Sequence, residues 1–133
     1  MTAQATKHKL LEITAEDERG QGARIFMALK EAKVNVEATC IWPSNSQAFF
    51  WIVPDDFVAA RKALRKAGYK NRTIPAVRVE MSNKPGAMAE VLEKIAAAGI
   101  DATVAFLTTS VKKNAVAYIT TSADTKAVKA INK

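Results

Sequence analysis

The residues best suited to binding a small anion lie in one short segment, Ser82-Asn83-Lys84-Pro85-Gly86, between an alternating apolar stretch and an apolar helix pattern. The first backbone N–H groups of a helix have no partner within the helix, and a glycine lets a ligand approach them closely. Such a segment suits the carboxylate of a small molecule, and Asn83 adds a side-chain amide beside it. The same segment is also typical of an ordinary, well-formed helix start, so both interpretations stay open here.

The rest of the sequence offers little to catalysis. Its single histidine, His8, lies in or beside an N-terminal stretch that we expect to be mobile and exposed, and its single cysteine, Cys40, has the setting of a buried residue. A histidine-based triad or a metal cluster cannot be built from this set. The segment Gly20-Gln21-Gly22 lacks the third glycine of a dinucleotide-binding loop, since residue 25 is isoleucine. We therefore expect no catalytic residue, no metal and no cofactor, and a protein that is not an enzyme.

The elements that position the glycine-containing segment follow from the spacing of apolar residues. Alternation predicts strands over residues 9–14, 34–42, 47–53 and 69–74. Three-and-four spacing predicts one helix over 23–32 and another that starts at Pro54-Asp55-Asp56 and stops at Gly68. The order then repeats, with a strand over 76–81, a helix over 85–98, strands over 100–107 and 114–120, and a last helix over 124–132.

The two halves of the chain share one pattern. A shift of 66 residues superposes them without a gap from Leu10 to Asp55, so that Gly20 falls on Gly86 and Ile25 on Val91. We predict an α+β fold of two ferredoxin-like βαββαβ repeats, over 7–74 and 75–133, each an antiparallel sheet with its helices packed on one face. The second repeat stops after its final helix and so lacks its last strand.

Composition is that of a soluble globular protein, with 49% apolar and 25% charged residues. No apolar run approaches the roughly 20 residues of a membrane span, and residues 1–6 contain no signal-peptide core. We therefore expect a cytoplasmic protein without a membrane partner.

Two features could indicate nucleic-acid binding. The net charge of +7 is spread over both halves, and its densest cluster is Arg61, Lys62, Arg65, Lys66, Lys70 and Arg72. We interpret this cluster as a solvated helix face rather than an anion-binding patch. The run Phe49-Phe50-Trp51 lies on a strand of βαββαβ order, as in RNA-binding domains, but the basic-glycine-aromatic signature of those domains is missing. Core or interface packing is the favoured role of these aromatic residues, and nucleic-acid binding is disfavoured.

The second repeat resembles the ACT domain, a ligand-binding regulatory module with a (D/N)-x-P-G loop and a GI(N/D) strand start. The loop motif is similar to Asn83-Lys84-Pro85-Gly86, which an apolar helix follows. The strand start is similar to Gly99-Ile100-Asp101-Ala102. The first repeat is similar: Asp17 and Gly20 take the loop positions, arginine replaces the usual proline at position 19, and Val34-Asn35-Val36 opens the strand. The resemblance covers roughly residues 9–133. It implies a tandem ACT protein, similar to small stand-alone regulators that sense amino acids. The ligand-contact positions it implies are Asn83, Lys84, Gly86, Asp101, Asp17, Gly20 and Asn35.

The topology of such a repeat makes the expected site more specific. With antiparallel strand order 4-1-3-2, Asn83 and Asp101 lie at opposite edges of one sheet, so a single copy cannot form the site. The segment Thr73-Ile74-Pro75 is too short to join two repeats edge to edge within one chain. We therefore predict composite sites between chains, and a homodimer.

Two other functions stay open. The chain could be a plain interaction subunit that has lost ligand binding, such as a regulatory partner of an amino-acid metabolic enzyme. A less favoured alternative is RNA or DNA binding through the basic helix face.

Overall fold

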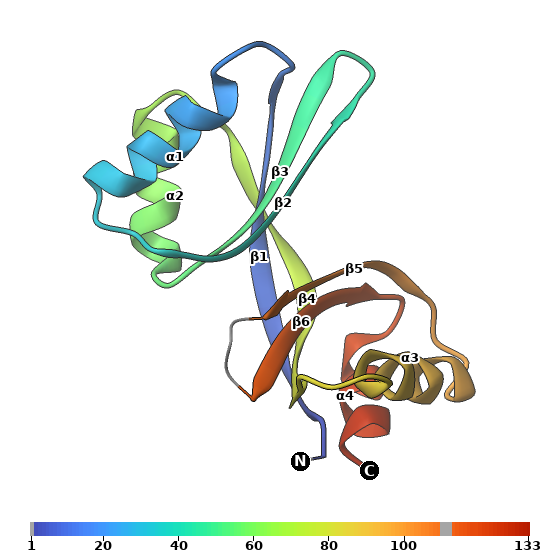
Figure 1. The fold of residues 1–133 in the computed structure, drawn as a ribbon. Coiled ribbons are helices and arrows are strands. Elements are labelled where there is room, and N and C mark those ends of the chain that lie inside the picture. Colours follow the sequence, from blue (N-terminus) through green and yellow to red (C-terminus); the bar gives the residue numbers. More distant parts are fainter. Residues whose placement is uncertain (1, 110–112) are drawn as a thin grey trace. The chain divides into compact units, whose positions relative to one another are not determined.

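A computed structural model describes residues 2–109 and 113–133 of the chain. The elements follow one another as strand-helix-strand-strand-helix-strand and then helix-strand-strand-helix, which is the predicted order except that one strand replaces two expected ones between the second and third helices (Figure 1). Their bounds are β1 Gln4–Glu16, α1 Gln21–Glu31, β2 Val36–Ser44, β3 Gln47–Pro54, α2 Phe57–Lys66, β4 Asn71–Ser82, α3 Ala87–Ala97, β5 Ala102–Thr109, β6 Asn114–Thr121 and α4 Asp124–Asn132. The predicted α+β class is confirmed.

The chain forms two compact units. The first unit is Leu10–Ile74, and the second unit combines Met1–Lys9 with Pro75–Lys133. The expected ranges, 7–74 and 75–133, differ from this division at the N-terminus, because residues 7–9 lie in the second unit. The N-terminus therefore belongs to the unit that the second half of the chain builds.

Strands β1 and β4 explain this division. The hydrogen-bonded strand order is β2-β3-β1-β4-β6-β5, and β1 and β4 each run through both units. The second repeat was predicted to lack a closing strand after α4. In the second unit the N-terminal part of β1 occupies the position of that strand, beside β4. The sequence pattern did not reveal this role, because alternation identifies a strand without indicating its partner.

The expectation of a mobile N-terminus was therefore wrong. Ala5 is only 4% exposed. The side chain of Asn132 binds both backbone groups of Ala5: its Oδ1 accepts from the Ala5 N–H at 2.7 Å, and its Nδ2 donates to the Ala5 carbonyl at 2.9 Å. His8 is half-buried, with its ring centroid 5.7 Å from that of Tyr118.

Two predicted boundaries also change. The strands expected over 69–74 and 76–81 form one strand, β4, which continues through Pro75 because the fixed φ of proline is compatible with an extended chain. Helix α3 begins at Ala87 rather than at Pro85, because Gly86 has a left-handed φ of 86° that a right-handed helix cannot contain.

The repeat itself is visible in the backbone. Gly20 and Gly86, 66 positions apart, precede α1 and α3 with φ of 83° and 86°. Lys33 and Gly99, at the same offset, follow these helices with φ of 60° and 74°. Equal spacing and equal unusual backbone conformation indicate one structural unit used twice.

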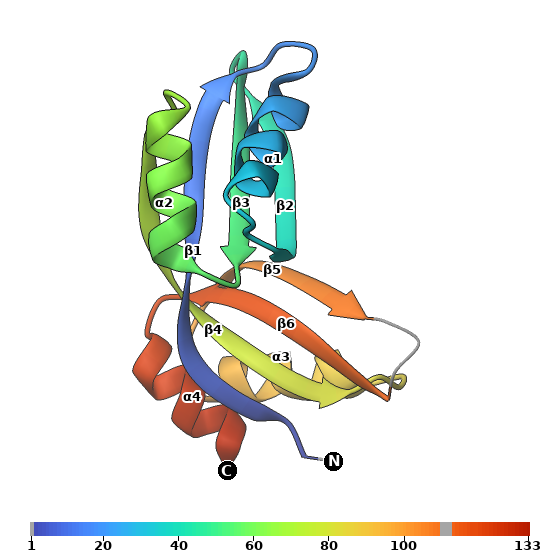
Figure 2. The ribbon, with the colours of Figure 1, turned by 90° about the vertical axis from the view of Figure 1, so that its left-hand side faces the viewer.

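Each unit buries one face of its sheet beneath its two helices. In the first unit Leu11, Ile13, Phe50 and Ile52 pack against apolar residues of α1 and α2. Figure 2 shows both helices over the same face of β1, β2 and β3. The second unit buries the equivalent residues, which include Val77, Val79, Ala117, Ile119, Val91 and Ile95. Over the described part of the chain, no helix is both long and apolar enough to cross a membrane.

Candidate functional site

The start of α3 presents free backbone donors. Gly86 precedes the helix, and no side chain caps it. The Ala87 N–H donates to the Lys84 carbonyl at 3.3 Å, and the Glu90 N–H donates to Gly86 at 3.0 Å. The N–H groups of residues 88 and 89, between these two, have no acceptor among the described residues. Two amides are therefore available to an anion at the positive end of the helix dipole.

The space over this helix start is open. Asn83, Lys84 and Gly86 are all exposed. A Cβ built on Gly86 would have no neighbouring atom within 4 Å, so none of the described residues crowds this position. The loop is nevertheless fixed, because the Asn83 N–H donates to the Lys113 carbonyl at 2.7 Å.

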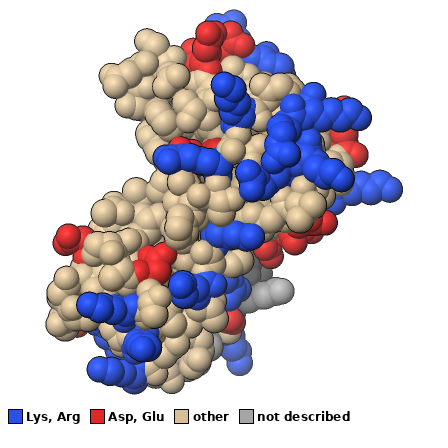
Figure 3. All heavy atoms as spheres, turned by 180° about the vertical axis from the view of Figure 1, so that it is seen from behind, with Lys and Arg blue, Asp and Glu red and all other residues tan. Residues whose placement is uncertain are grey.

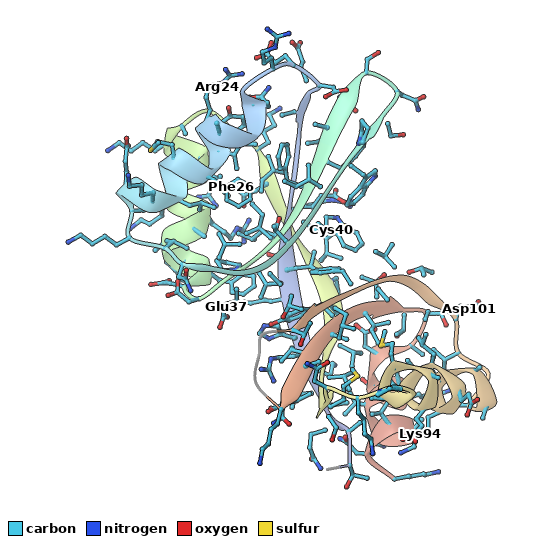
Figure 4. All side chains as sticks on the ribbon, viewed as in Figure 1. Arg24, Phe26, Glu37, Cys40, Lys94 and Asp101 are labelled. Carbon is cyan, nitrogen blue, oxygen red and sulfur yellow. The ribbon has the colours of Figure 1, made fainter. Side chains whose placement is uncertain are left out.

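The start of α1 has the same backbone but is covered. Gly20 precedes the helix with φ 83°, again without a side-chain cap. The guanidinium of Arg24 pairs with Glu18 and also donates to Gln21 at 3.2 Å. Its Nη1 atom would lie 3.4 Å from a Cβ on Gly20. Figure 4 shows Arg24 beside the first turn of α1. In the first repeat, therefore, the side chain of Arg24 covers the helix start, whereas no described residue crowds Gly86 at the equivalent start of α3.

The strand-start residues of the two repeats are held in the same way. The Asn35 N–H donates to Oδ1 of Asp55 at 3.0 Å, and the Asp55 N–H donates back to the Asn35 carbonyl at 2.9 Å. In the second repeat the Asp101 N–H donates to Oγ of Ser122 at 3.0 Å, with a return bond of 3.0 Å. The side chains of Asn35 and Asp101 remain exposed.

One unit does not bring the two halves of the site together. Ser82 pairs with Asn114 at one end of β6, whereas Ala102 pairs with Thr121 at the other end. The length of β6 separates Asn83 from Asp101 by about 24 Å, at roughly 3.4 Å per residue. In the first repeat Asp17 lies beside Ser46, and β3 separates it from Asn35 in the same manner.

A buried carboxylate on the helix-free face of the first unit was not expected from the sequence. Glu12 is 9% exposed. It accepts from Nε1 of Trp51 and from Nε of Arg72, both at 2.7 Å. Burial raises the pKa of Glu12, but the hydrogen bonds from Arg72 and Trp51 and the charge of Arg72 outweigh it, so the pKa lies below its ordinary value. Alternation along the strand places Glu12 opposite the core, but only the fold supplies its two donors.

Cys40 is half-buried rather than fully buried. Among the described residues, no group of three or more His, Cys, Asp or Glu side chains is arranged to hold a metal ion.

No family model and no curated protein matches the sequence. Solved structures do match the fold. Protein BT0572 from Bacteroides thetaiotaomicron superposes with a TM-score of 0.89 at 23% identity, over 96% of this chain and 88% of that one. The regulatory subunit of aspartate kinase from Thermus flavus gives 0.66 at 19% identity, over 99% and 95%. E. coli aspartokinase III, in complex with lysine and aspartate, gives 0.58 at 12% identity, over 98% of this chain and 31% of that one.

The expected resemblance to tandem ACT regulators is thus confirmed at the level of the fold. The chain has the fold of aspartate kinase regulatory subunits over nearly its whole length.

Proposed function

We propose that this chain is a non-catalytic, cytoplasmic regulatory protein that binds an amino acid at the start of α3. The observation that carries the proposal is the uncapped helix start at Gly86, where two amides have no acceptor among the described residues and no described residue crowds the glycine. The carboxylate of an amino acid fits these donors, and the exposed amide of Asn83 lies beside them. The structurally similar regulatory subunit of aspartate kinase supports a regulatory role.

The ammonium group of the ligand requires an acceptor that one unit does not supply. The carboxylate of Asp101 has the right charge, but it lies at the far end of the sheet. A second copy brings an Asp101 carboxylate closer to Asn83 if two β5 strands pair antiparallel about a two-fold axis. Asp101 of one copy then reaches the end of the sheet that holds Asn83 of the other, three strand spacings or roughly 14 Å away. We therefore propose a homodimer in which each site takes one residue from each chain.

Strand β5 is suited to such pairing. It is the last strand of the sheet, and its sequence from Ala102 to Thr109 contains no charged residue and no proline. Leu107 on this strand is 47% exposed. The opposite edge, β2, carries Glu37 and Pro43, which natural proteins use to keep an edge unpaired. The β5 edge is therefore the better candidate for pairing.

Thermal unfolding in the presence of each of the twenty amino acids tests the ligand. One of them should raise the melting temperature, because a ligand that binds only the folded state stabilises it. Asn83→Ala and Asp101→Ala should each abolish the shift, while Asp17→Ala, at the covered first loop, leaves it in place. If no amino acid shifts the transition, the sensor function is wrong.

The dimer has a matched test, because Leu107 and Ile41 occupy equivalent positions 66 residues apart and are 47% and 50% exposed. Leu107→Lys should convert the dimer to a monomer in size-exclusion light scattering and weaken amino-acid binding. Ile41→Lys should leave both unchanged. A monomeric wild-type protein at micromolar concentration contradicts the composite site.

A second function is favoured by the covered start of α1. Because Arg24 and Glu18 occupy that helix start, the first repeat fits a unit that contacts another protein instead of a ligand. In that case the chain is a regulatory subunit of an amino-acid metabolic enzyme. Co-purification with a metabolic enzyme, without any amino-acid-dependent thermal shift, would favour this function.

A further inference from the structure

The helix-free face of the first unit carries a surface that the proposed amino-acid site does not use. Leu11, Ile13 and Phe50 point into the core beneath α1 and α2. Because side chains alternate along a strand, Glu12, Thr14, Phe49 and Trp51 point to the other face. This face combines aromatic rings on β2 and β3 with polar and basic groups on β1 and β4.

The aromatic part is a stack that leaves one ring face directed toward β1. Trp42 and Phe49 are opposite each other on β2 and β3, and their rings stack at 5.5 Å with an interplanar angle of 11°. Trp51 meets Trp42 edge-on at 5.3 Å. Neighbouring strands lie about 4.8 Å apart, so the stacking direction runs across the strands. The free face of Phe49 is therefore directed toward its other cross-strand partner, Thr14, whose side chain is small and exposed.

A shallow hollow includes Thr14 in its lining. Its volume is about 310 Å³, and six polar residues line it: Glu12, Thr14, Gln47, Lys70, Asn71 and Arg72. A volume near 300 Å³ is at the lower end for small-molecule sites and suits one small ligand rather than a polymer strand. Arg72 neutralises Glu12 through Nε, so its terminal nitrogens and Lys70 remain as donors to an anion.

The segment that supplies Lys70 and Arg72 to the hollow is rich in basic residues. Residues 57–79 contain seven Lys or Arg and no Asp or Glu. Within the described residues, Arg61, Lys62, Arg65, Lys66 and Lys70 form no ion pair. The side chain of Arg61 reaches the rim of the hollow, where its Nε donates to Asn71 at 3.0 Å. Figure 3 shows Lys and Arg side chains gathered on the side of this unit that carries its two helices, opposite the helix-free face.

We propose that this face binds a free nucleotide, separately from the amino-acid site. The base stacks on Phe49 above Thr14, where every base offers a π-face to an aromatic ring. The amide of Gln47 is placed to contact the edge of the base. Lys70 and the terminal nitrogens of Arg72 hold the phosphate. A solvated basic face would account for the lysines, but it does not account for the stacked Trp42–Phe49 pair beside Thr14, which lines the hollow.

Titration of the full-length protein with AMP tests the site directly. Both tryptophans of the chain, Trp42 and Trp51, lie on this face. Their fluorescence, excited at a wavelength that adenine does not absorb, should therefore be quenched saturably. Adenosine lacks the phosphate and ribose 5-phosphate lacks the base. Each should bind at least about ten-fold more weakly, a difference of roughly 1.4 kcal/mol.

Variants separate stacking and charge from general effects on the fold. Phe49→Leu keeps an apolar residue and Lys70→Gln changes an exposed one, and each should weaken AMP binding at least about five-fold, or roughly 1 kcal/mol. Their controls lie in the second unit: Phe106→Leu, whose ring stacks on Tyr118 at 5.6 Å, and Lys129→Gln on α4. Neither control should change the affinity.

Three results would overturn the proposal. The first is the absence of saturable quenching up to millimolar AMP, and the second is wild-type affinity in both Phe49→Leu and Lys70→Gln. The third is a single-stranded oligonucleotide that binds ten-fold more tightly than AMP, which would make the surface a site for a polymer. None of these results depends on whether an amino acid binds at the start of α3.

Discussion

The side chain of Asn132 fastens the first strand of the chain to its last helix, and its removal should destabilise the second unit selectively. In Asn132→Ala the Ala5 N–H and carbonyl, now bonded at 2.7 and 2.9 Å, lose their partners. Each hydrogen bond contributes about 1 kcal/mol net, so the free energy of unfolding should fall by about 2 kcal/mol. For a unit of this size the melting temperature should drop by roughly 8–16 °C.

Hydrogen exchange followed by mass spectrometry locates this effect. A loss of about 2 kcal/mol corresponds to roughly 30-fold faster exchange where opening limits the rate. Peptides covering residues 4–9 and 114–121 should show it. Lys129→Ala, an exposed change on the same helix, should alter the stability by less than about 0.5 kcal/mol. If residues 4–9 of Asn132→Ala exchange at the wild-type rate, the N-terminal strand is not held as the structure indicates.

Two further predictions concern the backbone of the loops and the buried carboxylate. Gly86→Ala should lower the free energy of unfolding by about 1–2 kcal/mol in a denaturant titration, because the left-handed φ of 86° is unfavourable for alanine. No steric clash adds to this cost, since an added Cβ has no neighbour within 4 Å. An unchanged midpoint would show that the loop relaxes. The folded-state pKa of Glu12 lies below its unfolded value of about 4.3, so the stability it supplies is complete above that pH and is lost as pH falls through the folded pKa. Glu12→Gln should therefore flatten the acid side of the stability curve measured by tryptophan fluorescence, and a curve identical to wild type would contradict this role.

Much of the fold could be predicted because its signals are local. Spacing of apolar residues identified the four helices, and the offset of 66 residues between Gly20 and Gly86 identified the duplication before any coordinates. The structure gives these two glycines nearly the same φ, 83° and 86°. The loop Asn83-Lys84-Pro85-Gly86 pointed to a helix start with free donors for the same reason, since capping and glycine preference act over a few residues.

Pairing between distant segments was decided by the tertiary structure alone. The sequence of residues 4–9 alone does not show whether this segment is a loose terminus or a strand. In the structure it is the closing strand of the second unit, whose other elements come from the second half of the chain. The burial of Glu12 between Trp51 and Arg72 and the coverage of Gly20 by Arg24 also depend on neighbours that folding brings together. Local patterns fix the conformation of a segment, whereas its partners follow from the packing that buries the most apolar surface for the whole chain.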